Sequence, residues 1–179
     1  MQRGSYSFVL RRTCLVGAMV AIAILLCRLL GYPAYGAWRV EISFLPIYVV
    51  ALLYGPLWAG AAWGAADLIG AAITTGIDPF ITLIKVMCGV LFGLFFRGKG
   101  RVGFLRIFLC TTLVAVLLDF LAMMVVFHYQ FGYTWEAACT FRLISAGVNL
   151  PVRIVILWLA DRRLAGLLIK QKGRIDGTL

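Results

Sequence analysis

Polar and ionisable residues are scarce in this chain. Only 13% of its 179 residues are charged, Asp and Glu number seven together, and histidine occurs once. The five cysteines form no C-x-x-C pair, so the usual sequence pattern of a zinc site or a disulfide framework is missing. No Walker A sequence is present, so this chain does not hydrolyse ATP by that route. An embedded enzyme has weak support, because no nucleophile and base stand together.

One nucleotide-binding pattern does occur, but in an unsuitable context. Residues 98–103, Gly-Lys-Gly-Arg-Val-Gly, match G-x-G-x-x-G. That pattern binds dinucleotides between a strand and a helix, whereas here it lies in a basic loop between two apolar runs. The lone histidine, His128, lies at the boundary of an apolar run, where an interfacial residue is commoner than a ligand or base. We therefore expect no cofactor, no metal site and no catalytic residue.

Apolar residues dominate the chain instead. They make up 63% of it, and the mean hydropathy is +1.00, which is more apolar surface than a soluble domain of this size can bury. A bilayer-spanning helix needs about 20 residues, so six such runs nearly exhaust the length. They cover residues 14–31, 44–55, 57–75, 80–96, 106–128 and 141–160. We predict an all-α integral membrane protein, a compact bundle of six transmembrane helices that forms a single domain over residues 1–179.

The second and third runs meet at Gly55-Pro56. A helical hairpin is favoured there, because proline ends one helix and suits the first turn of the next. A single kinked helix is the competing interpretation.

Basic residues predict the orientation. They gather before the first run, between the fourth and fifth, and after the sixth: Arg3, Arg11, Arg12, Arg97, Lys99, Arg101, Arg106, Arg162, Arg163, Lys170, Lys172 and Arg174. The other connections carry little positive charge, so the positive-inside rule places both termini in the cytoplasm. The net charge of +10 follows from this distribution and needs no nucleic-acid partner. The first run is long and lacks a good cleavage site, so we expect a retained helix and not a signal peptide.

Several polar side chains lie inside the apolar runs. An ionisable residue near the bilayer centre costs about 2.5 kcal/mol or more, which suggests that each has a partner or a task. Asp67, Asp119, Asn149 and Arg153 fall close to the predicted midplane. These residues either pair with one another and fix the packing, or they contact a substrate. For Asp67 and Asp119 both interpretations stay open, whereas for Arg153 the structural one is favoured.

Cations without intramembrane counter-charges occupy the outer half of the predicted bundle. Arg28, Lys85 and Arg142 lie in the runs and Arg39 in a loop above them, whereas the acidic residues at that level are all in loops. An anion supplied from outside would satisfy these cations, since Arg holds a carboxylate bidentately and Lys acts as a point charge.

Aromatic residues crowd the same outer end. A membrane-interface belt explains most of them. Tyr35, Trp38 and Phe44, in the connection over residues 32–44, could also cover a flat heterocycle. Together, the cations and the aromatic residues predict a planar, anionic molecule that arrives from outside.

Small residues recur one helical turn apart. Gly17 and Ala21 form such a pair in the first run, and two G-x-x-x-G pairs follow at Gly60/Gly64 and Gly89/Gly93. Pairs of this kind let helices approach closely. We expect them mostly to pack the bundle itself, while Gly17 and Ala21 could equally receive a helix of a partner protein.

A longer pattern carries a family likeness. It runs from Arg28 to the region Arg142…Asn149-Leu-Pro-Val-Arg153 through the segments GYPAYGAWRVEISFLPI, LYGPLWAGAAWGAADLIGA and FITLIKVMCGVLFGLFF. Its most specific parts are ISFLPI, the LYGP turn with the Gly/Ala-rich stretch that contains Asp67, and the Asn-Leu-Pro of the last run. Over nearly its whole length the chain resembles the substrate-binding S components of energy-coupling factor (ECF) transporters, specifically their folate group.

The resemblance implies a function and partners. An S component of this group is a six-helix protein of the prokaryotic plasma membrane that captures folate or a folate-like vitamin from outside. It would work with a transmembrane T component and two cytoplasmic ABC ATPases. The family's Ala-x-x-x-Ala on the first helix docks the T component, and Gly17-x-x-x-Ala21 matches it with glycine for the first alanine.

Folate suits the charges because its pterin is flat and its glutamate tail is dianionic. The predicted substrate-binding residues are Arg28, Arg39, Lys85 and Arg142 as cations, Asp67 and Asn149 as partners of pterin nitrogens, and Tyr35, Trp38 and Phe44 as stacking or gating rings. These roles rest on charge and depth. Two other functions compete: an S component for another vitamin or a pterin- or deazapurine-like precursor, and a membrane scaffold with no substrate.

Overall fold

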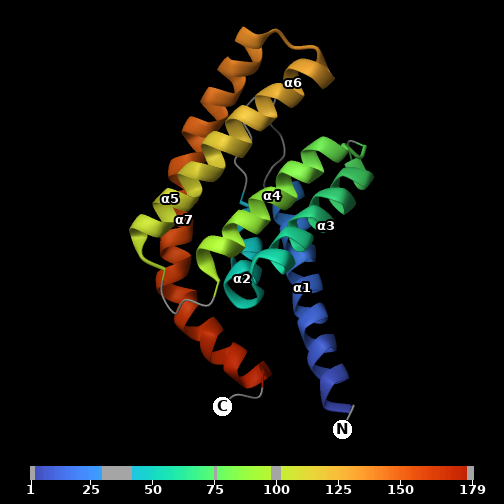
Figure 1. The fold of residues 1–179 in the computed structure, drawn as a ribbon, viewed down its shortest axis with the longest axis vertical. Helices are drawn as coiled ribbons and strands as arrows, with labels where there is room; N and C mark the ends of the chain where they lie inside the picture. The colour runs from blue at the N-terminus through green and yellow to red at the C-terminus, as the bar shows by residue number, and fades with distance from the viewer. Residues whose placement is uncertain (1–2, 30–41, 75, 98–101, 177–179) are drawn as a thin grey trace.

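The computed structural model describes residues 3–29, 42–74, 76–97 and 102–176, and the remaining residues lie outside this description. Within it every regular element is a helix (Figure 1). The elements are α1 (Arg3–Leu29), α2 (Phe44–Tyr54), α3 (Pro56–Thr74), α4 (Pro79–Phe96), α5 (Phe104–Val114), the π-helical segment η1 (Ala115–Ala122), α6 (Met123–Phe131) and α7 (Trp135–Asp176). Since α5, η1 and α6 follow one another without a break, the described chain forms six helices, which confirms the all-α prediction.

Two helices are longer than the sequence predicted. α1 begins at Arg3 and not near residue 14, and α7 continues to Asp176 instead of ending near residue 160. The added part of α7 is rich in Leu, Lys and Arg, which all favour the helix. Hydropathy therefore located the apolar part of these helices but not their ends.

α2 is a core helix and too short to cross a bilayer by itself. Its 11 residues span about 16 Å, whereas the hydrocarbon core is about 30 Å thick. Nine of those residues are buried, which explains why the helix is apolar on every side. Four other segments are long and apolar enough to span: Val9–Cys27, Pro79–Phe96, Phe104–Phe131 and Trp135–Leu164.

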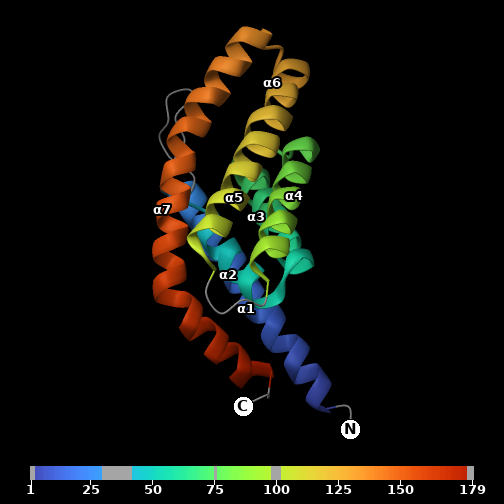
Figure 2. The ribbon, with the colours of Figure 1, turned by 60° about the vertical axis from the view of Figure 1, so that its left-hand side comes forward.

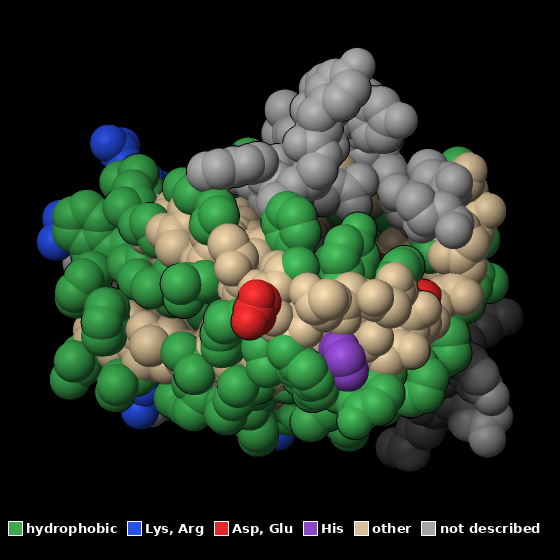
Figure 3. All heavy atoms as spheres, turned by 90° about the horizontal axis from the view of Figure 1, so that it is seen from above, with side chains coloured by type: hydrophobic (Ala, Val, Ile, Leu, Met, Phe, Trp, Pro, Cys, Tyr) green, Lys and Arg blue, Asp and Glu red, His purple; other side chains and the backbone are tan. Residues whose placement is uncertain are grey.

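The start of α1 and the end of α7 lie at one end of the bundle, which we call the termini end (Figure 1). The opposite end, called the far end, carries the turns at residues 76–78 and 132–134. Arg97, Arg162 and Arg163 are exposed and belong to segments at the termini end. On the far end, among the side chains drawn in colour, Figure 3 shows acidic groups and the histidine on the face, with Lys and Arg only toward its margins. The charge pattern agrees with the predicted orientation, although which side of a membrane each end faces stays a prediction.

The chain reverses at Gly55, as the hairpin interpretation predicted. α2 ends at Tyr54 and α3 begins at Pro56, and between them Gly55 adopts a φ of 88°, which favours glycine. Both G-x-x-x-G pairs then hold α3 against α4. A Cβ at Gly89 would lie 2.5 Å from the carbonyl oxygen of Ala59, and one at Gly93 would overlap the backbone of Pro56. These glycines therefore allow backbone-to-backbone contact between the two helices.

A buried carboxylate ties α7 to α2 and to the start of α5. Asp161 on α7 is 3% exposed, and the Tyr48 hydroxyl of α2 donates to its Oδ1 over 2.7 Å. The backbone N–H of Val102 lies 3.1 Å from both carboxylate oxygens. Three segments thus meet at one side chain, and its hydrogen bonds compensate for its burial.

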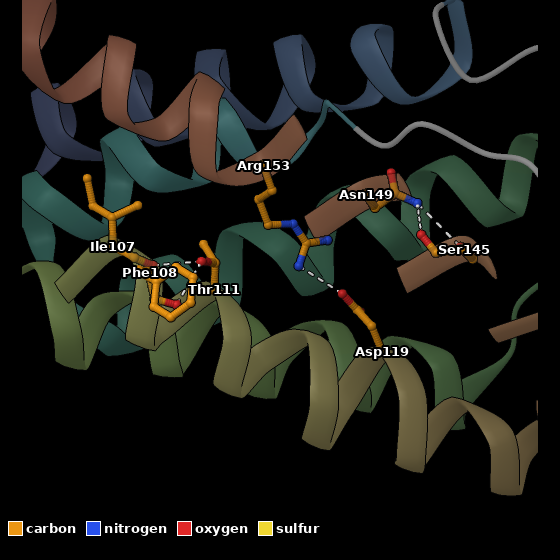
Figure 4. A network of polar contacts seen from close by, with 7 residues as sticks. All are labelled: Ile107, Phe108, Thr111, Asp119, Ser145, Asn149 and Arg153. Carbon is orange, nitrogen blue, oxygen red and sulfur yellow. Dashed lines mark hydrogen bonds and ion pairs between the residues drawn. The ribbon is translucent and has the colours of Figure 1, made fainter. Parts of the chain in front are cut away.

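A buried ion pair joins α7 to η1. Arg153 is 3% exposed, and its Nη1 lies 2.8 Å from Oδ2 of Asp119, which is 21% exposed (Figure 4). The guanidinium carbon also lies 5.5 Å from the centre of the Phe44 ring on α2. The sequence placed Asp119 and Arg153 at the same depth, and the structure pairs them with each other.

Because α3 and α4 are in close contact, alanine substitutions at two glycines should change the thermal stability by different amounts. Gly93→Ala should lower the thermal unfolding midpoint in detergent, because overpacking against the Pro56 backbone costs about 1–3 kcal/mol. Gly17→Ala is the matched control, since a Cβ at Gly17 meets no atom within 4 Å. Equal midpoints for the two variants would contradict the packing described above.

Because Asp119 and Arg153 form a buried ion pair, substitutions at the two positions should have non-additive effects on the unfolding free energy. Asp119→Asn leaves a buried guanidinium without its carboxylate, which should cost about 3–5 kcal/mol of unfolding free energy. Asp119→Leu combined with Arg153→Met should recover much of that loss, because it removes both charges. Asp78→Asn is the control, since asparagine can replace Asp78 as the cap of α4. Unfolding in one detergent measures all three variants, and a stable Asp119→Asn would show that the pair contributes little.

Candidate functional site

A crevice lies between α1 and α3 at the start of α2. Its lining consists of Ala23, Ile24, Cys27, Ser43, Trp63, Ala66, Asp67 and Gly70. The crevice has a cavity volume of about 30 Å³. Small-molecule sites hold about 300–1,000 Å³, so this crevice can take only a small part of a ligand as it stands. The lining comes from the last turns of α1, the residue before α2 and the later half of α3, so the crevice lies toward the far end.

Asp67 supplies the carboxylate of this lining. Its Oδ2 lies 2.8 Å from the Thr82 hydroxyl of α4, which is also 3.0 Å from the carbonyl oxygen of Asp78. In the described part of the chain no donor contacts the other oxygen, Oδ1. Asp67 is only partly buried and lines the crevice, so this oxygen can accept a hydrogen bond from a ligand. Asp67 therefore lines the crevice, and Arg153 pairs with Asp119 and not with Asp67.

Lys85 of α4 contacts an aromatic residue of the crevice lining. Its Nζ is 5.6 Å from the ring centre of Trp63, which lines the crevice and is 3% exposed. A cation at this distance is attracted to the ring face. Asp67 follows Trp63 by one helical turn on α3, so a cation from α4 and a carboxylate from α3 both lie near this ring. This arrangement suits a ligand with both a hydrogen-bond donor edge and an anionic group.

Two other predicted residues lie on α7, away from the described lining. Arg142 places its guanidinium carbon 4.0 Å from the centre of the Phe127 ring on α6. The Asn149 side chain donates to the carbonyl oxygen of Ser145 over 3.0 Å and lies 3.3 Å from its hydroxyl (Figure 4). The crevice lining includes neither residue. In this conformation the α6–α7 hairpin therefore carries them separately from Asp67 and Lys85.

The remaining predicted substrate residues divide into two groups. Tyr35, Trp38 and Arg39 lie outside the described residues. Arg28 belongs to the last turn of α1, directly after the lining residue Cys27, but its side chain also lies outside the description. Phe44 is described and is fully buried in the core, while its neighbour Ser43 lines the crevice.

The predicted docking pair lies on an open surface of α1. Gly17 and Ala21 are both exposed, and a Cβ added at Gly17 meets no atom within 4 Å. The face can therefore accept another helix at close range, as small-residue pairs allow. No group of three or more His, Cys, Asp or Glu side chains in the described residues could hold a metal ion.

Two polar residues in the structure escaped the sequence analysis. Ser43 is the polar residue of the otherwise apolar ISFLPI segment, and that isolation was a usable signal. Asp161 is followed by two arginines, so it reads as an exposed charge at the end of the last run. Its spacing of eight residues from Arg153 places both on one helical face, which was the available sign of burial.

Comparison with known proteins identifies the family. The family described as "ECF transporter, substrate-specific component" matches residues 11–159, well over half of the chain. A relative from Clostridium novyi (strain NT), "Folate transporter FolT", is 23% identical over 122 residues, which cover 67% of this chain and 70% of the relative. Among solved structures, "Crystal structure of FolT bound with folic acid" is similar with a TM-score of 0.77 and 23% identity, covering 85% of this chain and 93% of that chain.

The structural match at this identity establishes the fold, and it confirms the predicted helical membrane bundle. The family match establishes the class of protein, because it extends from the first turns of α1 almost to the end of the apolar part of α7. It also confirms the prediction that the chain is not an enzyme. The chain belongs to the family of substrate-specific components of ECF transporters and is a membrane-embedded transport subunit.

Proposed function

We propose that this subunit captures folate, or a vitamin with the same pterin and carboxylate groups, and presents it for uptake. The observation that carries the proposal is the crevice at the far end, which Trp63 and the Asp67 carboxylate line and where Lys85 of α4 contacts the Trp63 ring. The likeness to the Clostridium novyi folate transporter and to a FolT structure bound with folic acid supports the same ligand.

The chemistry of folate fits the side chains that the structure describes. Its pterin offers N–H donors, which the open Oδ1 of Asp67 can accept, and its tail offers carboxylates, which Lys85 can attract. The described crevice is smaller than a whole folate, so we assign it one part of the ligand only. Arg28, Tyr35, Trp38 and Arg39 are proposed to complete the site from the connection between α1 and α2. Arg142 and Asn149 are proposed to contact the ligand from α7. Phe44 is buried, so its proposed role is to support the neighbouring lining residue Ser43.

The proposed partners follow from the family. We propose that the subunit works with a transmembrane T component and two cytoplasmic ABC ATPases, in the plasma membrane of a prokaryote, which it crosses several times. Both termini are proposed to lie in the cytoplasm, so that the far end faces outward. The exposed Gly17 and Ala21 on α1 are the proposed docking face for the T component, since a helix can approach them closely.

A binding titration tests the proposed substrate. The purified protein is titrated with folate, 5-formyltetrahydrofolate, riboflavin and thiamine, and binding is followed by calorimetry. We expect the two folates to bind and the other two vitamins not to. Exclusive binding of riboflavin or thiamine would refute the specificity while leaving the transport family intact. No binding of any vitamin, together with a protein that purifies without a chromophore, would favour the scaffold function.

A charge-removing variant tests the role of Asp67 in the same assay. Asp67→Asn should weaken folate binding about tenfold or more, because a hydrogen bond to a charged group contributes about 1.5–3 kcal/mol. Asp78→Asn makes the same chemical change at the cap of α4 and should leave the affinity unchanged. If Asp67→Asn binds folate as the control does, Asp67 has only the structural role of accepting from Thr82.

A further inference from the structure

The α6–α7 hairpin divides into a tightly packed half and a loosely packed half. We call the loose half the far arm: α6, the turn at residues 132–134, and α7 from Trp135 to Leu150. Three residues of the far arm are buried, Met123, Val126 and Ala138, whereas four are buried in the short stretch of α7 from Arg153 to Asp161. Figures 1 and 2 both show the far arm extending beyond the ends of α3 and α4.

Features that weaken a helix gather where the two halves meet. In α7, Pro151 has no N–H to donate, and its ring crowds the carbonyl group one turn earlier, at Gly147. Gly147 is exposed, and a Cβ there would meet no atom within 4 Å. Between them, the Asn149 side chain donates a hydrogen bond back to the Ser145 carbonyl and so competes with the helix backbone for that acceptor. Sharp bends in helices usually occur at such positions.

The other helix of the hairpin is weakened at the same level. η1 covers Ala115–Ala122 with π-helical hydrogen bonding, which is rare and often marks a functional position. The ion pair of Asp119 with Arg153 shows that η1 lies beside α7 only two residues beyond Pro151. Two antiparallel helices therefore lose regular α-helical bonding side by side, and one charge pair joins them there.

We propose that the far arm moves as a unit about a hinge at Gly147–Pro151 and η1, with the Asp119–Arg153 pair as its pivot. Below the pivot, the hydrogen bonds of Asp161 to Tyr48 and Val102 hold α7 in place. Above it, the arm carries Arg142 and Asn149, which its motion brings toward the crevice or takes away from it. Phe44 connects the pivot to the crevice, because Arg153 lies over the Phe44 ring and Phe44 follows the lining residue Ser43.

The hinge itself depends only on the helices. Its coupling to a ligand rests on the proposed function, because Arg142 and Asn149 are proposed ligand contacts. On that basis, ligand binding closes the far arm over the crevice. The bound protein then samples fewer positions of the far arm, as hinge closure does in other binding proteins.

The hinge is tested by measuring distances between pairs of spin labels. The sample is the full chain in lipid nanodiscs. The five cysteines are replaced by alanine, and labels are attached to Gln130→Cys on the far arm and Ile77→Cys before α4, both exposed positions. A second pair, Arg97→Cys and Arg163→Cys, reports on the termini end. We expect a broad distance distribution for the first pair and a narrow one for the second.

Two matched pairs of substitutions decide the outcome. Pro151→Ala and Gly147→Ala should each narrow the distribution of the far-arm pair, because each makes α7 a more regular helix. Pro79→Ala, at the first turn of α4, and Gly17→Ala, on open surface, should leave it unchanged. An unchanged width in Gly147→Ala, which has space for its methyl group, would overturn the hinge, as would equal narrowing of both label pairs.

Adding 5-formyltetrahydrofolate separates the hinge from the substrate. If it binds in the titration above, the far-arm distance should shift and the termini-end distance should not. Binding without a shift would overturn the coupling. If no folate binds but Pro151→Ala and Gly147→Ala still narrow the distribution, the proposed substrate fails and the hinge stands.

Discussion

The packing of α7 against α2 organises this bundle, and it depends on two buried ionisable residues of α7. Arg153 lies over the Phe44 ring and pairs with Asp119, while Asp161 accepts hydrogen bonds from Tyr48 and Val102. In apolar surroundings such groups have to find their partners within the protein. Those partners come from different segments. The contacts of Arg153 and Asp161 with them therefore fix how α2, η1 and the start of α5 lie around α7.

The second constraint is the contact between α3 and α4, which places the functional residues. Glycine at positions 89 and 93 lets the two backbones meet, so Thr82 on α4 can donate to Asp67 on α3. The same closeness brings Lys85 of α4 over the Trp63 ring of α3. The positions of Asp67 and Lys85 therefore depend on the two glycines, because only a residue without a side chain permits this contact of α3 and α4. The two halves of the protein differ accordingly: the packing around α2 to α4 is dense, whereas the far arm rests on few buried residues.

Sequence reasoning succeeded where a property belongs to one helix. The apolar runs, the break at Gly55-Pro56 and the faces bearing glycine pairs follow from hydropathy and spacing, and the structure confirms them. It was less complete where burial depends on another segment. Phe44 has the sequence of a loop-end aromatic but lies in the core, and Asp161 has the sequence of a surface charge but is buried. η1 carries no recognisable sequence signal, because a π-helix differs from an α-helix by its hydrogen bonding and not by its composition.

The sequence by itself determined that this chain is a helical membrane protein, which ends carry the positive charge, and which side chains are too polar for lipid. Those properties depend on local composition and on the period of a helix, and both are written along the chain. Tertiary structure alone decided that Asp119 pairs with Arg153, while Asp67 accepts from Thr82 and lines the crevice. The sequence predicts a similar depth for all of these residues, so only the rotation of the helices and their contacts decide which of them pair. The contacts between helices thus distinguish Asp119, which stabilises the fold, from Asp67, which is proposed to bind a ligand.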